Sequence, residues 1–419
     1  MAFECKTNEQ RTALTRVAQW MKDPSRQVFY LGGYAGTGKT ELARHFAQGV
    51  NGSVCFGAYT GKAALVLIQR GCYNARTIHS WLYSYSGHGS QRLQELTKAL
   101  AGVREQEDAA PGDVEALEEE IAKEQAKVDQ PNWRVNEETE LRGAALVVLD
   151  ECSMIDKRVA GDLLAVCKKI LVLGDPAQLP PVKGTGYFTN REPDYLLTTV
   201  VRHDNGILDI ATKVREGNIN LPFGHINQDV AKFSKRGLPI EEFAKASQLL
   251  TGRNDARLKL NAGLRRVHGR QGNYPVAGDR VICLKNNREH ALVNGQIETV
   301  AADARELEAD CIVFPLEGHV VPNPDCPPEP DAGPTPLSVY TGHFRKYWQA
   351  DVRLLNYYDR MEYDEFDYGY AITVHKSQGS QWSHPWLCDD NFLHWRPSDR
   401  RKWLYTAITR AVDKLTIVA

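Results

Sequence analysis

The chain has 419 residues, of which 42% are hydrophobic and 25% charged, and its formal net charge at pH 7 is -2. A chain of this length exceeds what one hydrophobic core usually serves, so at least two domains are expected. The composition argues against a disordered or membrane-embedded protein, and the near-neutral charge restricts any nucleic-acid site to a local groove. Nine dispersed cysteines without a CxxC pair, no apolar spanning run and no signal peptide lead us to expect a cytoplasmic protein with reduced thiols.

Four apolar segments, each ending in a polar cluster, predict parallel strands at residues 28–33, 53–59, 145–151 and 170–175. A polar helix is expected before them at residues 7–21, and helical stretches follow the first two strands. Short strands that are apolar throughout are typical of a parallel sheet covered by helices on both faces, which is an α/β fold. Ligands of such sheets bind at the C-terminal ends of the strands, so functional side chains are expected there.

The segment GYAGTGKT at residues 33–40 matches the phosphate-binding loop pattern GxxxxGK[ST], between an apolar strand and a helical stretch. Its glycines let backbone N–H groups surround phosphates, its lysine reaches the β and γ phosphates, and its threonine hydroxyl can bind Mg2+. We expect ATP and Mg2+ as ligands; the alternative is a tight glycine turn that binds nothing. The expected nucleotide-binding residues are Gly33, Ala35, Gly36, Thr37, Gly38, Lys39 and Thr40.

Polar side chains at the ends of two later strands complete a predicted hydrolytic site. Asp150 and Glu151 end the strand ALVVLDE, where Asp150 would hold magnesium and Glu151 would orient or deprotonate the attacking water. Gln178, in GDPAQLPPV after the next strand, could bind the γ-phosphate or that water. The alternatives are a helix cap for the acidic pair and simple turn chemistry for the amide.

Two insertions interrupt the α/β pattern. Between residues 83 and 140 the chain is polar, and apolar residues at helical spacing on both sides of Ala110-Pro111-Gly112 predict an antiparallel helical hairpin. A charged spacer is the alternative. Between about residues 274 and 366, the stretches DRVICL and GQIETV predict a small β domain with a turn at Asn294-Gly295.

The motifs, in this order, resemble those of superfamily 1B DNA helicases of the RecD-like and phage Dda-like branch. AYTGKAA, TIHSWL, VVLDECSM and GDPAQLPPV resemble motifs Ia, Ib, II and III, and segments around Arg202, at residues 251–265, at AITVHKSQGSQW and at LYTAITRAVDKLTIV resemble the later motifs. The resemblance implies tandem RecA-like P-loop NTPase domains with a helical insertion and an SH3-like β insertion. The implied domains are core 1A at 1–82 and 141–190, insertion 1B at 83–140, core 2A at 191–273 and 366–419, and insertion 2B at 274–365.

The resemblance also implies roles for further residues. Asn8 and Gln10 are expected at the adenine, and Arg202 and Arg410 are expected to reach the phosphates from the second core. An arginine from a second domain neutralises the transferring group only when the cleft shuts, which couples closure to hydrolysis. The alternative for either arginine is a solvated salt bridge. With these, the expected catalytic residues are Lys39, Glu151, Gln178, Arg202 and Arg410.

A track for single-stranded nucleic acid is expected across both cores, where polar groups and cations follow the backbone. The matching residues are Thr60, Lys62, Thr77, His79, Ser80, Thr373, His375 and Lys376. Four aromatic residues near the first insertion are candidates for a wedge that separates duplex strands: Trp81, Tyr83, Tyr85 and Trp133. The alternative is that alternating aromatics form one packed face of a strand.

The expected function is an ATP-dependent DNA helicase that translocates on single-stranded DNA, with 5′-3′ direction implied by the resemblance alone. One alternative is an RNA helicase or nucleic-acid-stimulated NTPase, because backbone tracking barely distinguishes the sugars. Another is a non-motor binding module switched by ATP. The expected partners are single-stranded DNA, junctions of single and double strands, and replication or recombination proteins, with no membrane. We expect a monomer in a bacterial cell or a phage-infected host.

Overall fold

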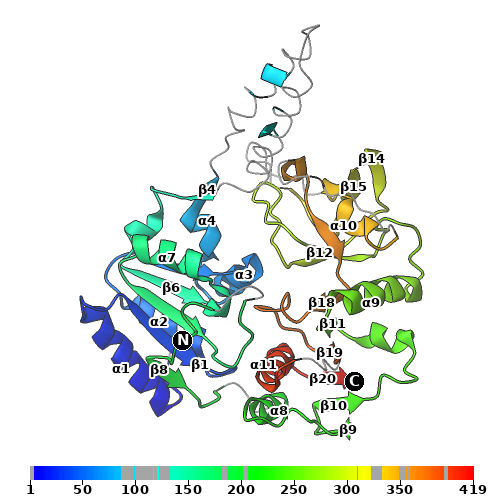
Figure 1. Ribbon diagram of the computed structural model, residues 1–419. Helices are drawn as coiled ribbons and strands as arrows, with labels where there is room; N and C mark the ends of the chain where they lie inside the picture. The colour runs from blue at the N-terminus through cyan, green and yellow to red at the C-terminus, as the bar shows by residue number, and fades with distance from the viewer. Residues whose placement is uncertain are drawn as a thin grey trace.

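The computed structural model describes most of the chain. The described residues are 4–85, 96, 98–100, 117, 120–121, 133–181, 186–201, 206–308, 310–321, 333–348, 355, 359–390 and 395–419. They form two α/β cores and a β insertion that stands above the second core (Figure 1). The expected helical hairpin at residues 93–128 lies almost entirely outside these residues.

The first core is built on a six-stranded sheet in which every pairing is parallel. The strand order is β3 (Arg76–Thr77), β2 (Val54–Ala58), β6 (Leu146–Asp150), β7 (Ile170–Gly174), β1 (Val28–Gly33) and β8 (Tyr195–Leu197). Because parallel strands end at one edge, the segments that follow β1, β2, β6 and β7 all emerge there. The predicted phosphate loop follows β1, the predicted nucleic-acid contacts at Thr60 and Lys62 follow β2, the acidic pair is at the end of β6, and Gln178 follows β7.

Helices cover both faces of the first sheet, because consecutive side chains of each strand point to opposite sides. Phe29 and Leu31 of β1 pack with α1 (Asn8–Lys22), α2 (Lys39–Gln48) and α3 (Gly61–Gln69). Tyr30, between them, packs on the other face with α4 (Ile78–Leu82) and α7 (Lys157–Val166). The short helices η1 (Glu140–Arg142) and η2 (Cys152–Met154) and the antiparallel pair β4 (Tyr83–Tyr85) and β5 (Trp133–Val135) complete this half.

The second core has its own six-stranded sheet, parallel except for one edge strand. The order is β18 (Ala371–Thr373), β11 (Gln248–Thr251), β19 (Pro385–Cys388), β20 (Leu415–Val418), β10 (Val230–Phe233) and the antiparallel β9 (Gly224–His225). One face packs against α8 (Gly206–Arg215) and α11 (Pro397–Ile408). The other packs against α9 (Asn254–Val267) and η3 (Ile240–Lys245).

The β insertion consists of two three-stranded sheets. One has the order β13 (Ile297–Thr299), β12 (Arg280–Cys283) and β17 (Phe366–Tyr368); the other is β14 (Arg305–Glu308), β15 (Cys311–Pro315) and β16 (Pro336–Tyr340), followed by α10 (Gly342–Arg345) and η4 (Asp359–Glu362). Its core is continuous with that of the second α/β core, since Val281 and Phe314 share one buried cluster with Leu249 and Leu264. The insertion therefore packs directly against the second core through a shared hydrophobic core.

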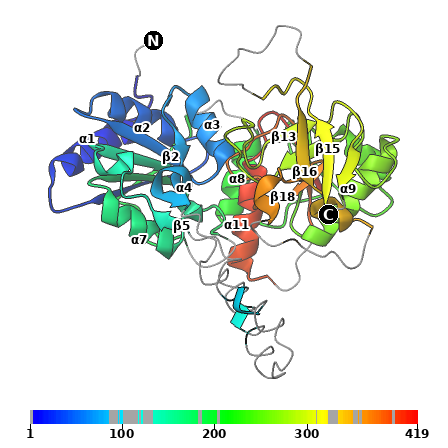
Figure 2. The ribbon, with the colours of Figure 1, turned by 90° about the horizontal axis from the view of Figure 1, so that it is seen from above.

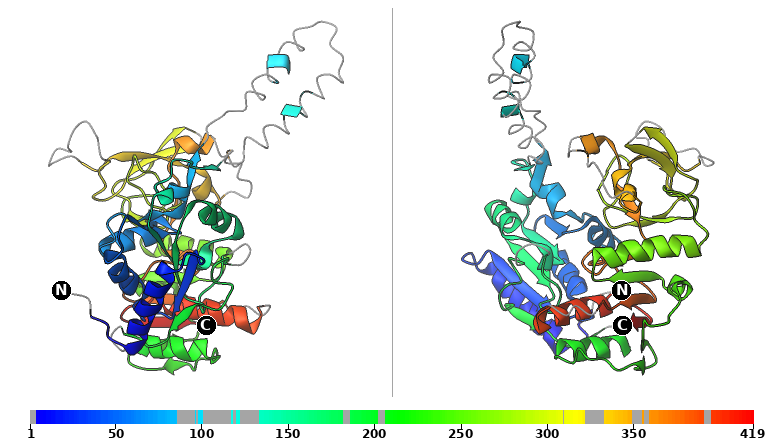
Figure 3. Two further views of the ribbon diagram at one scale, coloured as in Figure 1. Left: turned by 90° about the vertical axis from the view of Figure 1, so that its left-hand side faces the viewer. Right: turned by 45° about the vertical axis from the view of Figure 1, so that its right-hand side comes forward.

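The two cores stand side by side, and α11 lies between them in Figures 1 and 2. Figure 3 shows the same relation from two further sides, with the β insertion facing the upper part of the first core. None of the helices in the described part of the chain combines the length and apolar character that a membrane crossing needs.

Two expected boundaries differ from the structure. β8, at Tyr195–Leu197, pairs with β1, so the first core extends past residue 190. β17, at Phe366–Tyr368, pairs with β12, so the chain returns to the second large sheet only at β18. Both short strands follow loops and lack the long apolar runs that marked the other strands in the sequence. The expected turn at Asn294-Gly295 is present, with Gly295 at φ +89°, at the end of a longer connection between β12 and β13.

Candidate nucleotide and nucleic-acid site

The phosphate loop runs from the end of β1 into α2 with the conformation that its glycines allow. Gly36 and Gly38 have φ of +80° and +82°, where a side chain would be strained. The Lys39 ammonium donates to the carbonyl oxygens of Gly33 at 2.6 Å and Tyr34 at 3.1 Å, so it lies folded over the loop. The loop thus brings a cation and the N-terminus of α2 to one point, which suits a polyphosphate.

The acidic pair lies directly opposite the phosphate loop. The Thr40 hydroxyl donates to Asp150 Oδ2 at 2.7 Å, and the other oxygen of Asp150 accepts from the backbone N–H of Glu151 at 2.8 Å. Glu151 has a left-handed φ of +54°, an uncommon conformation for a residue with a side chain. Burial raises the pKa of Glu151 despite the nearby charges of Arg410 and Lys39. A hydroxyl and a carboxylate side by side are oxygen ligands of the type that Mg2+ prefers.

The loop after β7 brings Gln178 to the same edge. Gln178 is 7% exposed, and its side-chain oxygen Oε1 has no hydrogen-bond partner within the described structure. A buried amide oxygen without a partner is costly, so this acceptor suits a hydrogen bond from a water molecule. The loop is held by Asp175, whose Oδ1 accepts from the backbone N–H of Ala177 at 2.9 Å. Burial raises the pKa of Asp175.

Arg410 enters from the second core, at the end of α11. It is 4% exposed, and its guanidinium donates to the carbonyl oxygens of Thr406 at 3.1 Å and Ser380 at 3.3 Å. The positive charge of Arg410 opposes the rise in the pKa of Glu151, so the arginine acts electrostatically on the first core, while its hydrogen bonds stay within the second; its role at the phosphates stays a prediction. Arg202 lies outside the described residues, but the preceding Val201 donates from its backbone N–H to the carbonyl oxygen of Gly36 at 2.9 Å.

Gln10 and Asn8 lie at the start of α1. Gln10 is 3% exposed, and its amide accepts from the backbone N–H of Lys6 at 2.9 Å and donates to the carbonyl oxygen of Thr37 at 3.2 Å. Gln10 is thus attached to the phosphate loop, whereas the side chain of Asn8 is exposed. Adenine recognition by these two residues stays a prediction.

Three threonines of the predicted strand track share one geometry. Each follows or ends a strand, and each hydroxyl accepts from the backbone N–H three residues later: Ala63 for Thr60, Ser80 for Thr77 and Lys376 for Thr373, at 3.2 to 3.3 Å. A hydroxyl that accepts in this way retains its own proton for donation, which suits a phosphate oxygen. The structure places two of these turns in the first core and one in the second.

The two cores contact each other along this track. A Cβ added to Gly379, next to the Thr373 turn, would lie 3.0 Å from Ala63 Cβ and 3.4 Å from Thr60 Oγ1. The Lys62 ammonium lies 5.0 Å from the centre of the Trp382 ring of the second core, a cation–π contact. The turn of Thr60 therefore contacts the segment that follows the Thr373 turn.

The remaining predicted track residues are placed on the same two turns or on α4. His79 packs between the rings of Tyr59 and Tyr83, at centroid distances of 5.4 and 5.7 Å. Partial removal from water lowers the pKa of His79, and burial likewise lowers that of His375. Ser80 Oγ donates to the carbonyl oxygen of Thr77 at 2.8 Å. Neutral histidines beside hydroxyl groups offer hydrogen bonds to a nucleic-acid strand without a fixed positive charge.

The proposed wedge is wrong for the two aromatic residues that the structure describes. Trp81 is 4% exposed and Tyr83 is 8% exposed, and both belong to the hydrophobic core beneath the first sheet. The Tyr83 hydroxyl also donates to Asp162 at 2.6 Å. Side chains held in a core cannot insert between base pairs; both aromatic residues are packed, but Trp81 belongs to α4 and only Tyr83 to a strand, so they do not form one face of a strand. The side chains of Tyr85 and Trp133 lie outside the described residues.

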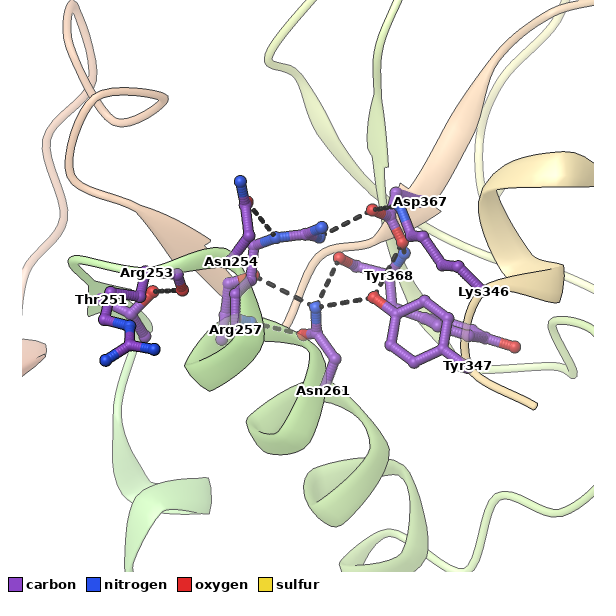
Figure 4. Close-up of polar contacts among 10 residues, drawn as sticks. Thr251, Arg253, Asn254, Arg257, Asn261, Lys346, Tyr347, Asp367 and Tyr368 are labelled. Carbon is purple, nitrogen blue, oxygen red and sulfur yellow. Dashed lines mark hydrogen bonds and ion pairs between the residues drawn. The ribbon is translucent and has the colours of Figure 1, made fainter. Parts of the chain in front are cut away.

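One polar cluster was missed in the sequence. Asp367, 2% exposed, accepts from Arg257 of α9 at 2.6 Å, from Lys346 at 2.6 Å and from the Tyr347 hydroxyl at 2.8 Å (Figure 4). Asn261 donates from its side chain to the carbonyl oxygen of Tyr368 at 3.0 Å. The cluster ties α9 to the insertion. Its members are far apart in the chain, and a lone aspartate on an apolar strand was the only signal.

Two family profiles match the sequence. The profile described as AAA domain matches residues 6–237, and the profile described as UvrD-like helicase C-terminal domain matches residues 368–418. Among curated protein sequences, none matches this chain closely enough to count as a relative.

Three solved structures of Pif1 helicases share the fold over 99% of this chain and 92% of theirs. A structure of two coordinating Pif1 helicases at forked double-stranded DNA has 15% identity and a TM-score of 0.53. Bacteroides Pif1 bound to single-stranded DNA has 13% identity and a TM-score of 0.51, and the Bacteroides protein with ADP-AlF3 and single-stranded DNA has 14% and 0.51. These likenesses establish the tandem-core fold and do not specify the RecD-like or Dda-like branch. Because the AAA domain profile covers more than half of the chain, the chain belongs to the AAA domain family, and the end of its second core matches the UvrD-like helicase C-terminal domain.

Proposed function

We propose that the chain is a DNA helicase that moves along single-stranded DNA in the 5′-3′ direction and couples ATP hydrolysis to duplex unwinding. The observation that carries the proposal is that the same two cores form both sites. At their junction the charge of Arg410 acts on Glu151 of the proposed nucleotide site, and Gly379 lies close to Thr60 of the proposed track for nucleic acid. A change at one site must therefore be felt at the other.

At the nucleotide, each residue has a chemical task that its placement supports. Lys39 would release the loop carbonyls and neutralise the β and γ phosphates, and Gln178 would orient the attacking water. The raised pKa of Glu151 makes its carboxylate a stronger base for that water. Thr40 and Asp150 would hold Mg2+, which supplies charge neutralisation on the phosphates. Arg410 would complete the site from the second core.

At the nucleic acid, the turns of Thr60, Thr77 and Thr373 would bind the sugar-phosphate backbone from both cores. When ATP binds, the cores close and bring the turns together. When the products of hydrolysis leave, the turns separate. The two cores thus bind the DNA in alternation, and the protein advances along it. Support for DNA as the nucleic acid comes from the structural neighbours, which are Pif1 helicases at forked double-stranded DNA and bound to single-stranded DNA. The direction rests on the resemblance to the superfamily branch. We propose a monomer acting on single-stranded DNA and on junctions, in the cytoplasm.

The test compares ATP hydrolysis without nucleic acid, with single-stranded DNA and with single-stranded RNA. Strong stimulation by DNA supports the proposal, whereas stimulation only by RNA would favour the RNA helicase alternative. Strand displacement on duplexes with a 5′ or a 3′ tail tests the direction, and unwinding only from a 3′ tail would refute it. ATP binding without turnover under all conditions would favour the switched binding module.

A further inference from the structure

Tyr405 of α11 makes a two-sided contact with the first core. Its hydroxyl accepts from the backbone N–H of Ala35 in the phosphate loop at 2.9 Å and donates to Asp175 Oδ2 at 2.7 Å. The side chain is 2% exposed, and burial together with the Asp175 carboxylate raises the pKa of Tyr405 well above its usual value. The phenol therefore stays protonated and donates its proton to Asp175.

Asp175 links this hydroxyl to Gln178, the residue proposed to orient the attacking water. One oxygen of its carboxylate accepts from Tyr405, and the other accepts from the backbone N–H of Ala177 at 2.9 Å. The backbone carbonyl of Asp175 accepts from Gln178 N–H at 3.2 Å. The turn that carries Gln178 is thus built around one aspartate, and the orientation of that aspartate depends on a tyrosine from the other core.

Further contacts beside Tyr405 attach the same loop to the second core. The N–H of Leu179 donates to Thr406 Oγ1 at 3.0 Å, and its carbonyl accepts from the Gln378 side chain at 3.2 Å. Leu179 is buried within the hydrophobic cluster of the second core, although it belongs to the first. These bonds exist only while the cores are in contact, because each joins one core to the other.

We propose that Tyr405 is a positioning residue that holds Gln178 in its hydrolytic orientation, through Asp175, only when the two cores are closed. The proposal deepens the proposed function and rests on it, since it names how closure on the strand is transmitted to hydrolysis. When the cores separate, Ala35 and Asp175 lose the hydroxyl and the Gln178 turn loses its support. Hydrolysis is then withheld until the cores close again.

The first experiment replaces Tyr405→Phe, which removes the hydroxyl and keeps the ring. We expect the DNA-stimulated kcat to fall roughly 10- to 100-fold, as for the loss of one hydrogen bond to a charged group. The ATP KM and the affinity for single-stranded DNA without nucleotide should stay within about threefold of wild type, because the loop loses only the acceptor of the Ala35 N–H, while Lys39, the glycine turns and the track keep their contacts. A kcat within about twofold of wild type overturns the proposal.

Tyr370→Phe is the matched control. Tyr370 is also buried, at 4% exposed, and its hydroxyl donates to the Asp279 carboxylate at 2.8 Å, but that bond lies within the second half of the molecule. Tyr370→Phe should lose about as much folding stability as Tyr405→Phe, and it should keep the kcat of wild type. Equal losses of kcat in both variants would reduce Tyr405 to a structural role and overturn the proposal. If Tyr405→Phe does not fold, Asp175→Asn replaces it: the amide carries no charge and offers only one acceptor oxygen, so the charge-assisted bond donated by Tyr405 is lost or reversed, and unchanged kcat overturns the proposal equally.

A double variant tests whether Tyr405 acts through Gln178. If it does, Tyr405→Phe combined with Gln178→Ala should have the kcat of Gln178→Ala alone, within about twofold. Multiplied losses would show that the two residues act independently and would overturn the proposal. Failure of the proposed function has a different signature, since wild-type protein would then show no stimulation by DNA. Normal stimulation in both wild type and Tyr405→Phe would overturn the inference alone.

Discussion

Gly379 of the second core lies so close to Ala63 of the first that a methyl group there would be 3.0 Å from Ala63 Cβ. Its φ of +76° is also in the left-handed region. Glycine is therefore favoured twice at this point, once by the left-handed backbone and once by the neighbouring core, which would have to shift by a few tenths of an ångström to admit a methyl group. The contact joins the two turns that the strand is proposed to cross.

Gly379→Ala should weaken single-stranded DNA affinity and DNA-stimulated ATPase by roughly tenfold, because the added methyl holds the two track turns apart. Gly237→Ala is the matched control, since its φ is +78° and no atom lies within 4 Å of the added Cβ. Both variants should lose about 1 kcal/mol of stability to backbone strain. Equal DNA affinities of the two variants, measured by fluorescence anisotropy, would contradict the role of the contact.

Lys39→Ala should abolish ATP turnover and leave nucleotide-independent DNA binding intact. The ammonium contacts only loop carbonyls at the nucleotide site, at 2.6 and 3.1 Å, so its removal takes the phosphate contact and leaves the strand track unchanged. Steady-state ATPase and DNA anisotropy on one preparation measure both effects. Wild-type turnover in this variant would refute the role of the phosphate loop.

Glu151→Gln should trap a tight complex with ATP and single-stranded DNA, because the base is lost while both cores retain their other contacts.

The raised pKa of Glu151 also sets the sign of the pH dependence in wild type. As pH falls through that pKa, the carboxylate is protonated and kcat should decline at a pH above the usual range of glutamate. A pH profile in which the kcat of the wild type declines only near the usual glutamate pKa of about 4.3 would contradict this.

Asp367→Asn should lower the free energy of unfolding by about 3 kcal/mol or more, because Arg257 and Lys346 are left without their common carboxylate. Asp209→Asn removes an exposed pair with Lys213 and should cost less than about 0.5 kcal/mol. Urea unfolding of the two variants gives the comparison. Similar midpoints would mean that the buried cluster contributes little.

The nucleotide site could be predicted because its parts are contiguous in sequence. The predicted first strand at 28–33 coincides with β1, and the loop, Asp150 and Gln178 all follow apolar strands that end at one edge. The apolar strands required a parallel sheet, and the sheet brought the polar ends together. The pairing of β12 with β17 was not predictable in this way, because it joins distant segments with no local signal.

Tyr405 and the wedge show why side-chain roles were harder to predict than strands. α11 is buried from Trp403 to Ile408, so no polar face distinguishes a tyrosine that reaches the other core from one that fills space. Trp81 and Tyr83 alternate as exposed residues of a hairpin would, yet both pack inward. In both cases the deciding partner, Asp175 or Asp162, comes from a separate part of the chain.

Lys376 predicts how DNA binding depends on alkaline pH. Removal from water lowers its pKa to about 8, and Asp367 opposes this while Arg257 and Lys346 add to it. The side chain is therefore charged below pH 8 and loses its charge above it, so about one tenth is neutral at pH 7 and about nine tenths at pH 9. The affinity for single-stranded DNA should weaken from pH 7 to pH 9 by up to about tenfold, because a cation that is proposed to face phosphate is lost. Lys376→Arg stays charged over this range and should flatten the profile, and an equally steep decline in the arginine variant would assign the pH dependence to another group.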